Sequence, residues 1–157
     1  MGRRHAKEAG FTLVEILCVL VVISLMTSVV ILSMPTSKTS LEKQAERLSA
    51  ELNALAQDGL ISGSVTAAGF SKDGYALYSF ENSKWAERVS NEWQDSYRLS
   101  LTRASARLDM PKTTEPLILF QPTGLSTPFE LTLSDRETKF SLTTQGDGRV
   151  ELIKSLP

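Results

Sequence analysis

One acidic residue, Glu15, interrupts the most apolar stretch of this 157-residue chain. Of the 24 residues from Phe11 to Met34, 18 are apolar. An α-helix of that length rises about 36 Å, which exceeds the roughly 30 Å hydrocarbon core of a bilayer, so the run is long enough to span a membrane. A carboxylate in such a segment costs about 2.5 to 3.5 kcal/mol at the helix centre and somewhat less near an end. Because of this cost, Glu15 is a candidate functional residue that requires a partner.

The partner that the neighbouring residues provide is an α-amine. Cleavage between Gly10 and Phe11 creates an amine that is cationic near neutral pH, one helical turn before Glu15. When parallel helices pack with a small axial stagger, the amine of one subunit reaches the carboxylate of its neighbour, and both charges are neutralised in lipid. Glu15 is therefore interpreted as a residue that favours assembly of subunits in a defined register.

A family resemblance supports this interpretation. The leader MGRRHAKEAG, followed by FTLVE and an apolar helix, resembles the class III signal of type IV pilins and type II secretion pseudopilins. The resemblance implies that a prepilin peptidase cuts after Gly10, that the same enzyme N-methylates Phe11, and that Glu15 serves subunit docking. Residues 1–10 are then a cleaved leader, and residues 11–34 are a transmembrane helix.

The basic leader predicts the topology. Arg3, Arg4 and Lys7 precede the apolar run, and basic residues favour the cytoplasmic side of a membrane. We therefore expect a single-pass protein of the bacterial inner membrane, with a cytoplasmic N-terminus before cleavage and a globular domain in the periplasm. A secretory signal has a shorter apolar region of about 7 to 15 residues and a small-residue cleavage site, which Ser33-Met34-Pro35-Thr36 does not provide. A plain signal anchor fits the length but leaves Glu15 unexplained.

Composition argues against an enzyme. The single histidine, His5, lies in the leader, and the single cysteine, Cys18, lies in the apolar run, so histidine triads, histidine-bound zinc and intramolecular disulfides are all excluded from the processed chain. Carboxylate chemistry in a membrane-anchored periplasmic enzyme is not excluded, but no motif supports it. Asp135, Glu137 and Asp147 are candidate calcium ligands without EF-hand spacing, and solvated turn acids are the favoured interpretation. We expect no catalytic residue, cofactor or metal.

Beyond Pro35 the pattern becomes that of an amphipathic helix. Apolar residues recur at steps of four and three, at Leu41, Ala45, Leu48, Leu52 and Leu55. Thr39 with Glu42 forms a predicted capping box, and Gly59 is the predicted C-terminal stop. Residues 35–58 are thus either the continuation of one bent helix or part of a second helix that starts near residue 39. The stripe is expected to pack on the domain that follows.

Residues 59–157 are predicted to form a β-rich domain. Period-two alternation and turn signals predict seven or eight short antiparallel strands within 64–70, 75–80, 97–102, 117–120, 129–133, 140–143 and 150–153. We expect an α+β, pilin-like fold, with a long N-terminal helix followed by a β-sandwich-like domain.

The segment from Glu81 to Asp95 is the least strand-like part of the domain. The favoured prediction is a surface loop or short helix whose Trp85 and Trp93 cover the edge of the core. The alternative is a partner surface, since exposed aromatic residues ringed by polar groups serve as binding anchors.

A second resemblance narrows the function. LILFQPTGLSTPFELTL, from Leu117 to Leu133, resembles the strand, turn and strand unit of the H-type minor pseudopilin domain. This implies a structural subunit near the tip of the type II secretion pseudopilus that supports export of folded proteins across the outer membrane. Its implied partners are the prepilin peptidase, other minor pseudopilins, the major pseudopilin and the inner membrane.

The alternative is a minor type IV pilin that acts in pilus assembly, adhesion or DNA uptake. Binding to DNA requires an exposed basic surface. The processed chain has 14 Lys and Arg, which is 17 minus the three in the leader, against 17 Asp and Glu, which is 18 minus Glu8. Near the C-terminus, Arg149 and Lys154 stand beside Asp147 and Glu151. We therefore expect no nucleic-acid partner.

Overall fold

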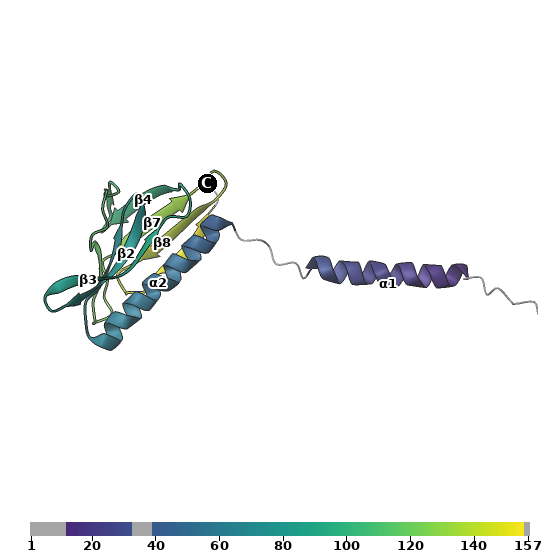
Figure 1. Cartoon of the computed structure of the whole chain (residues 1–157), viewed down its shortest axis with the longest axis horizontal. Helices are drawn as coiled ribbons and strands as arrows, with labels where there is room; N and C mark the ends of the chain where they lie inside the picture. Colours follow the sequence, from purple (N-terminus) through teal and green to yellow (C-terminus); the bar gives the residue numbers. More distant parts are fainter. Residues whose placement is uncertain (1–11, 33–38, 156–157) are drawn as a thin grey trace, which may run out of the picture. The chain divides into compact units, whose positions relative to one another are not determined.

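The computed structural model describes residues 12–32 and 39–155, and the side chains of residues 25–32 lie outside that description. The chain divides into two units, Met1–Ser37 and Lys38–Pro157. Figure 1 shows both units, coloured along the sequence. The first contains helix α1, and the second contains helix α2 and all of the described strands.

Helix α1 spans Leu13–Leu32. The predicted transmembrane segment, residues 11–34, extends past it at both ends, and residues 11, 33 and 34 lie outside the described ranges. Across residues 12–32 and 39–155, no helix meets the length and hydropathy of a membrane span. The boundaries of the transmembrane segment stay a prediction.

Helix α2 spans Ser40–Ser62, so the second of the two helix alternatives agrees with the described residues. Thr39 is the N-cap, and its hydroxyl accepts a hydrogen bond from the Glu42 amide at 3.2 Å. The predicted stop at Gly59 is wrong, because the helix continues to Ser62 and its C-cap is Gly63, which has a left-handed φ of 68°. Gly59 instead permits a close approach, since a Cβ there would lie 3.1 Å from the Ser64 carbonyl oxygen.

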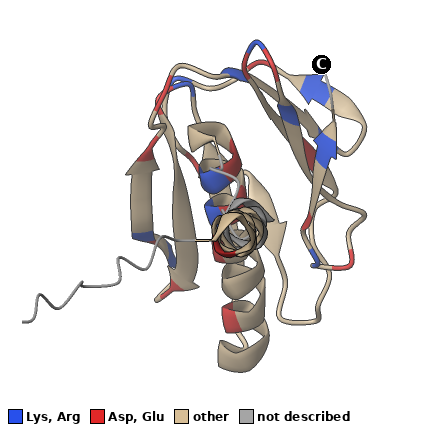
Figure 2. Cartoon of the chain, turned by 90° about the vertical axis from the view of Figure 1, so that its right-hand side faces the viewer, with Lys and Arg blue, Asp and Glu red and all other residues tan. Residues whose placement is uncertain are grey.

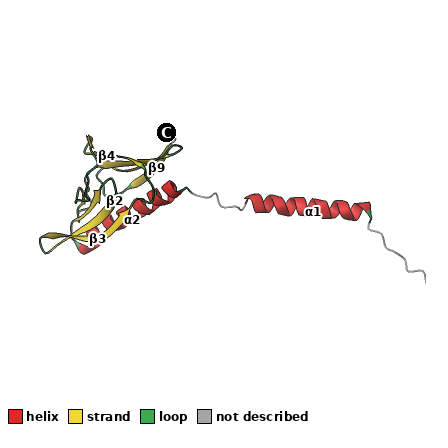
Figure 3. Ribbon diagram, turned by 45° about the horizontal axis from the view of Figure 1, so that its top comes forward, coloured by secondary structure: helices red, strands yellow, loops and turns green. Residues whose placement is uncertain are grey.

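Two antiparallel sheets form the rest of the second unit, which confirms the predicted α+β fold (Figure 3). One sheet has the order β3-β2-β1-β6 and the other has the order β5-β4-β7-β8-β9. The strands are β1 Thr66–Phe70, β2 Gly74–Glu81, β3 Lys84–Glu92, β4 Arg98–Arg103, β5 Ala106–Leu108, β6 Ile118–Phe120, β7 Phe129–Ser134, β8 Lys139–Thr144 and β9 Glu151–Ser155.

The core lies where α2 packs against both sheets. The predicted stripe of α2 is buried, with Leu41, Ala45, Leu48 and Leu52 fully shielded from solvent. These side chains join one cluster with inward residues of both sheets, such as Phe70, Leu101, Phe120, Leu131 and Leu142. Burial of this apolar area is the main source of the stability of the second unit.

The loop or short helix predicted between Glu81 and Asp95 is wrong for most of its length. Residues 84–92 form β3, which pairs antiparallel with β2 and has one register shift, where Arg88 has no Cα partner. The connecting residues Asn82 and Ser83 both have positive φ, as a tight hairpin turn requires. β3 is an edge strand that is largely exposed, so its polar and charged sequence lacks the alternation expected of a half-buried strand.

A second hairpin was also absent from the prediction. β4 and the three-residue β5 are joined by Ala104 and Ser105, which have φ values of 45° and 68°. Neither residue type is typical at positive φ, so the turn carried no local signal.

Candidate functional site

Glu15 lies in the first turn of α1. Its backbone N–H donates to the Thr12 carbonyl oxygen at 3.0 Å and is also 3.3 Å from the Thr12 hydroxyl oxygen, so Thr12 caps this end of the helix. An acidic side chain at a helix N-terminus interacts favourably with the helix dipole. Gly10 and Phe11, the predicted cleavage and methylation residues, lie outside the described residues, and their roles stay predictions.

The side chains around Glu15 are apolar and exposed. Every residue from 12 to 24 is exposed, including Leu13 at 83%, Val14 at 66% and Leu17 at 58%. A helix that is apolar on all faces is normally buried in a larger core or in a membrane. This end of α1 therefore requires an apolar environment from outside its own unit.

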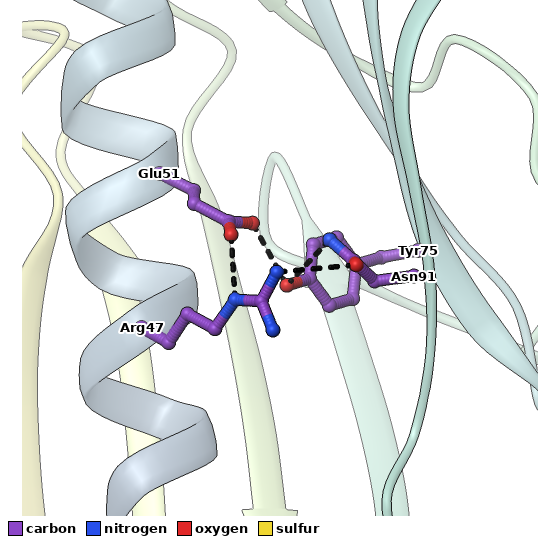
Figure 4. A network of polar contacts seen from close by, with 4 residues as sticks. All are labelled: Arg47, Glu51, Tyr75 and Asn91. Carbon is purple, nitrogen blue, oxygen red and sulfur yellow. Dashed lines mark hydrogen bonds and ion pairs between the residues drawn. The ribbon is translucent and has the colours of Figure 1, made fainter.

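In the second unit, α2 is tied to the first sheet by a polar network of four residues (Figure 4). The Tyr75 hydroxyl donates to Glu51 Oε2 at 2.8 Å, and Arg47 Nε donates to Glu51 Oε1 at 2.8 Å. Asn91 completes the network, because its Nδ2 donates to the Tyr75 hydroxyl and its Oδ1 accepts from Arg47, both at 3.2 Å. Every member thus has a partner within the network.

Tyr75 is the centre of this network. Only 1% of its surface is exposed, and its ring packs against that of Trp93 at 5.1 Å between centroids. Burial, followed by the hydrogen bond to Glu51, raises the pKa of Tyr75 well above its ordinary value. A neutral, hydrogen-bonded tyrosine positions a helix on a sheet and is not a base or nucleophile at neutral pH.

Asn53 ties α2 to Val150, the residue that directly precedes β9 of the second sheet. Its Nδ2 donates to the Val150 carbonyl oxygen at 2.9 Å, and its Oδ1 accepts from the Val150 N–H at 3.0 Å. Near the other end of the helix, Lys154 of β9 lies 3.6 Å from Glu42. α2 is therefore held on both sheets by polar contacts as well as by its buried stripe.

The three turn acids considered as candidate calcium ligands do not converge. Asp135 and Glu137 precede β8, whereas Asp147 follows it, and a six-residue strand separates them by roughly 20 Å. Asp135 Oδ1 accepts the N–H groups of Glu137 and Thr138, both at 2.8 Å, and these bonds lower the pKa of Asp135. Asp147 Oδ1 accepts the Arg149 N–H at 3.1 Å. These acids stabilise turns.

The two tryptophans have different environments. Trp93 is partly buried against the core and donates from Nε1 to the Ser71 carbonyl oxygen at 3.0 Å, so it covers the core edge as expected. Trp85 lies in β3 and remains 38% exposed, packed against Phe80 at 5.1 Å between ring centroids.

Sequence analysis missed the network residues of α2. Arg47 and Glu51 are four residues apart, which is a recognisable helical ion-pair spacing. Their link to Tyr75 and Asn91, and that of Asn53 to Val150, depend on long-range packing and had no local signal.

The chain is similar to known proteins in its N-terminal motif and over most of its length. The prokaryotic N-terminal methylation motif matches residues 5–31. The chain is 28% identical over 143 residues to the type II secretion system protein H of Pseudomonas aeruginosa, with 81% of this chain and 83% of that protein covered.

Two solved structures share the fold. The minor pseudopilin EpsH of the type 2 secretion system of Vibrio cholerae aligns with a TM-score of 0.61 and 16% identity, over 73% of this chain and 97% of that one. The solution structure of E. coli GspH aligns with a TM-score of 0.53 and 20% identity, over 71% of this chain and 84% of that one. At these identities the likeness shows the fold.

A methylation motif ahead of an apolar helix, followed by a second helix packed on antiparallel sheets, defines the class of pilin-like proteins. Within that class, the motif and the Pseudomonas relative make this chain similar to a type II secretion protein H, and the two solved pseudopilin structures share its fold. Pseudopilins are structural subunits rather than enzymes. The motif and the similarity imply processing by a prepilin peptidase, assembly with other pseudopilins, and an inner-membrane anchor that carries a periplasmic domain.

Proposed function

We propose that this chain is a structural subunit near the tip of the type II secretion pseudopilus, where it supports export of folded proteins across the outer membrane. The observation that carries the proposal is Glu15 in the first turn of a helix whose described side chains are all exposed and mostly apolar. Such a helix is suited to lipid before assembly and to contact with neighbouring helices after it.

Each predicted segment has a role in this proposal. The prepilin peptidase removes residues 1–10 and methylates the new amine of Phe11. Residues 11–34 anchor the chain in the inner membrane, and Glu15 pairs with the N-terminal amine of a neighbouring subunit in the filament. The β domain lies in the periplasm, where it contacts other minor pseudopilins. The chain catalyses nothing, and its action is mechanical.

Nucleic acid is not a partner in this proposal. Basic and acidic residues are interspersed over α2, the strands and the loops (Figure 2). The processed chain has a net charge of −3, from 14 basic and 17 acidic residues. Interspersed charges and a net negative charge do not favour the phosphate contacts on which nucleic-acid binding depends.

The experiment that tests the proposal uses Glu15→Ala in the full chain, in cells with a functional secretion system. We expect normal removal of the leader but loss of filament incorporation and of secretion, because the neighbour's amine loses its counter-charge in lipid. Glu46→Ala, a change of the same type in α2, is the matched control and is expected to secrete normally. Undiminished secretion by Glu15→Ala would contradict the proposal.

A second variant tests the leader. Replacing Gly10 with a bulky residue, as in Gly10→Trp, should block cleavage and leave a precursor about ten residues longer than the mature chain, visible by mass spectrometry. A mature product that still begins at Phe11 would show that cleavage does not require Gly10, and would contradict the role assigned to this residue.

A further inference from the structure

Exposed apolar side chains gather at one end of the second unit. α2 ends at Ser62, and β1 begins nearby at Thr66, whose Cα partners are Ser79 in β2 and Phe120 in β6. The C-terminal end of α2, the β2–β3 hairpin and the turn after β6 therefore lie at the same end of the unit, which Figure 1 shows for α2 and β3. Five of the seven large apolar side chains exposed among residues 39–155 lie at this end: Leu60, Ile61, Phe80, Trp85 and Leu125.

A groove of about 550 Å³ opens among these elements. Its walls are the last turns of α2, the turn after β6 and the turn between β8 and β9. Ala56, Phe120 and Val150 are buried side chains that line it, whereas Leu60 and Leu125 are 49% and 58% exposed. Apart from two glycines, the rest of the lining is polar or charged. A groove of this size that combines apolar side chains with a few polar groups is typical of sites that receive part of a partner molecule.

The groove is held open by hydrogen-bonded turns. The Gln121 N–H donates to the Leu125 carbonyl oxygen at 2.7 Å, and the Gly148 N–H donates to the Ser126 hydroxyl at 3.2 Å. Gly148 has a φ of 75°, and a Cβ there would lie 2.7 Å from the Gly124 carbonyl oxygen. The two turns are thus in direct contact, so a partner meets a preformed surface and loses less entropy on binding.

The charges of the groove select the type of partner. Asp147 and Arg149 are the charged residues that line it, one of each sign, so the lining has no net charge. Electrostatic complementarity therefore favours an uncharged, apolar protein surface rather than an acidic or basic one. A groove that combines apolar side chains with polar ones and with charges of both signs has the composition of a protein interface.

The opposite end of the second unit is not complementary to the groove, because its exposed residues are polar and charged rather than apolar. The turns that follow β1 and β7 lie at this end. The start of α2 lies there too, since the Ser40 hydroxyl donates to Asp95 at 2.8 Å. The described residues of those turns expose no large apolar side chain, and they carry several charges: Lys72, Asp73, Asp95, Asp135, Arg136 and Glu137. End-to-end stacking of two copies would set an apolar groove against polar turns.

We propose that the groove between Leu60 and Leu125 docks an apolar, uncharged surface of a different subunit of the same filament, and not a second copy of this chain. The inference rests on the proposed function and specifies the contact. It implies that this chain does not stack on itself, so that each copy is followed, on its apolar end, by another kind of subunit.

Site-specific crosslinking tests the contact. A benzophenone amino acid replaces Leu125 in the full chain, in cells with the secretion system, and the adduct is identified by mass spectrometry. The matched control carries the same replacement at Ile153, which is 49% exposed on β9. We expect an adduct with a different pilin-like subunit from position 125 and little from position 153. An adduct with a second copy, equal yields at the two positions, or no adduct at position 125 would overturn the proposal.

A charge introduced beside the groove provides a second measurement. Ile61→Asp in the crosslinker-bearing chain changes a side chain that is 86% exposed, so the fold is retained. Burial of an unpaired carboxylate in an interface should reduce the adduct roughly tenfold or more. Ser62→Asp, a neighbouring exposed change, should reduce it much less. Equal reduction by both would overturn the proposal.

The two proposals fail separately. If Glu15→Ala stops secretion while the adduct at position 125 is absent, the filament role stands and the docking surface is wrong. If Glu15→Ala secretes normally, the filament role is contradicted whatever the crosslinking shows.

Discussion

The two helices of this chain differ in whether their apolar side chains are buried. α2 buries one stripe against its own sheets and faces solvent with charged and small residues, whereas all described side chains of α1 are exposed, most of them apolar. α2 therefore buries its apolar stripe within its own folded unit, whereas the described part of α1 leaves its apolar side chains exposed to an environment outside its unit. The comparison separates residues that stabilise the second unit from described residues that are not buried within their own unit.

The largest expected difference concerns the same substitution in the two helices. Leu48→Ala in α2 removes a fully buried side chain and should lower the free energy of unfolding of the second unit by about 2 to 5 kcal/mol. Leu17→Ala in α1, where the side chain is 58% exposed, should leave that value unchanged. Denaturant titration of the full chain in detergent, followed by tryptophan fluorescence, measures both. Equal losses would show that the two helices do not differ as described.

A smaller effect is expected from the network that ties α2 to β2. Tyr75→Phe leaves Glu51 and Asn91 without their shared partner and should cost about 1 to 3 kcal/mol of unfolding free energy. Tyr97→Phe is the control, since its hydroxyl makes an exposed contact with Asp95 at 3.3 Å and should cost less than about 0.5 kcal/mol. If Tyr97→Phe costs as much, the network does not specifically hold the helix.

The two helix caps allow a further comparison. Thr39→Ala removes the hydroxyl that caps α2 and should destabilise the second unit by about 1 kcal/mol. Thr12→Ala removes the corresponding cap of α1 and should not change the melting temperature of the second unit. A fall in that temperature with Thr12→Ala would show that the first unit contributes to the stability of the second.

The smallest expected effect concerns pH. Because backbone N–H groups lower the pKa of Asp135, its contribution to stability is present above the ordinary carboxylate pKa of about 4 and is lost as pH falls through the lower folded value. Asp135→Asn should therefore melt at a lower temperature than the unmodified chain at pH 7, and the difference should shrink at pH 2. A difference that is the same at both pH values would be inconsistent with this account.

Local patterns predicted much of the fold. The stripe of α2, its cap at Thr39 and most of the strands follow from spacings of three and four or of two residues, which a short window reveals. β3 and β5 were missed because an exposed edge strand and a three-residue strand have little apolar alternation. The end of α2 was misplaced because a glycine such as Gly59 commonly marks a helix stop. In the fold this glycine lies within the helix and allows Thr66 to approach closely, which the local sequence pattern does not indicate.

The candidate site divides in the same way. The leader, Gly10, Phe11 and Glu15 lie within fifteen consecutive residues, so their roles could be predicted from residue type and spacing alone. The network around Tyr75, the tie between Asn53 and Val150, and the groove beside Leu60 bring together residues that are up to 97 positions apart. Such contacts depend on strand register and on how α2 packs across both sheets, and these are properties of the folded chain because each arises from many weak long-range contacts acting together.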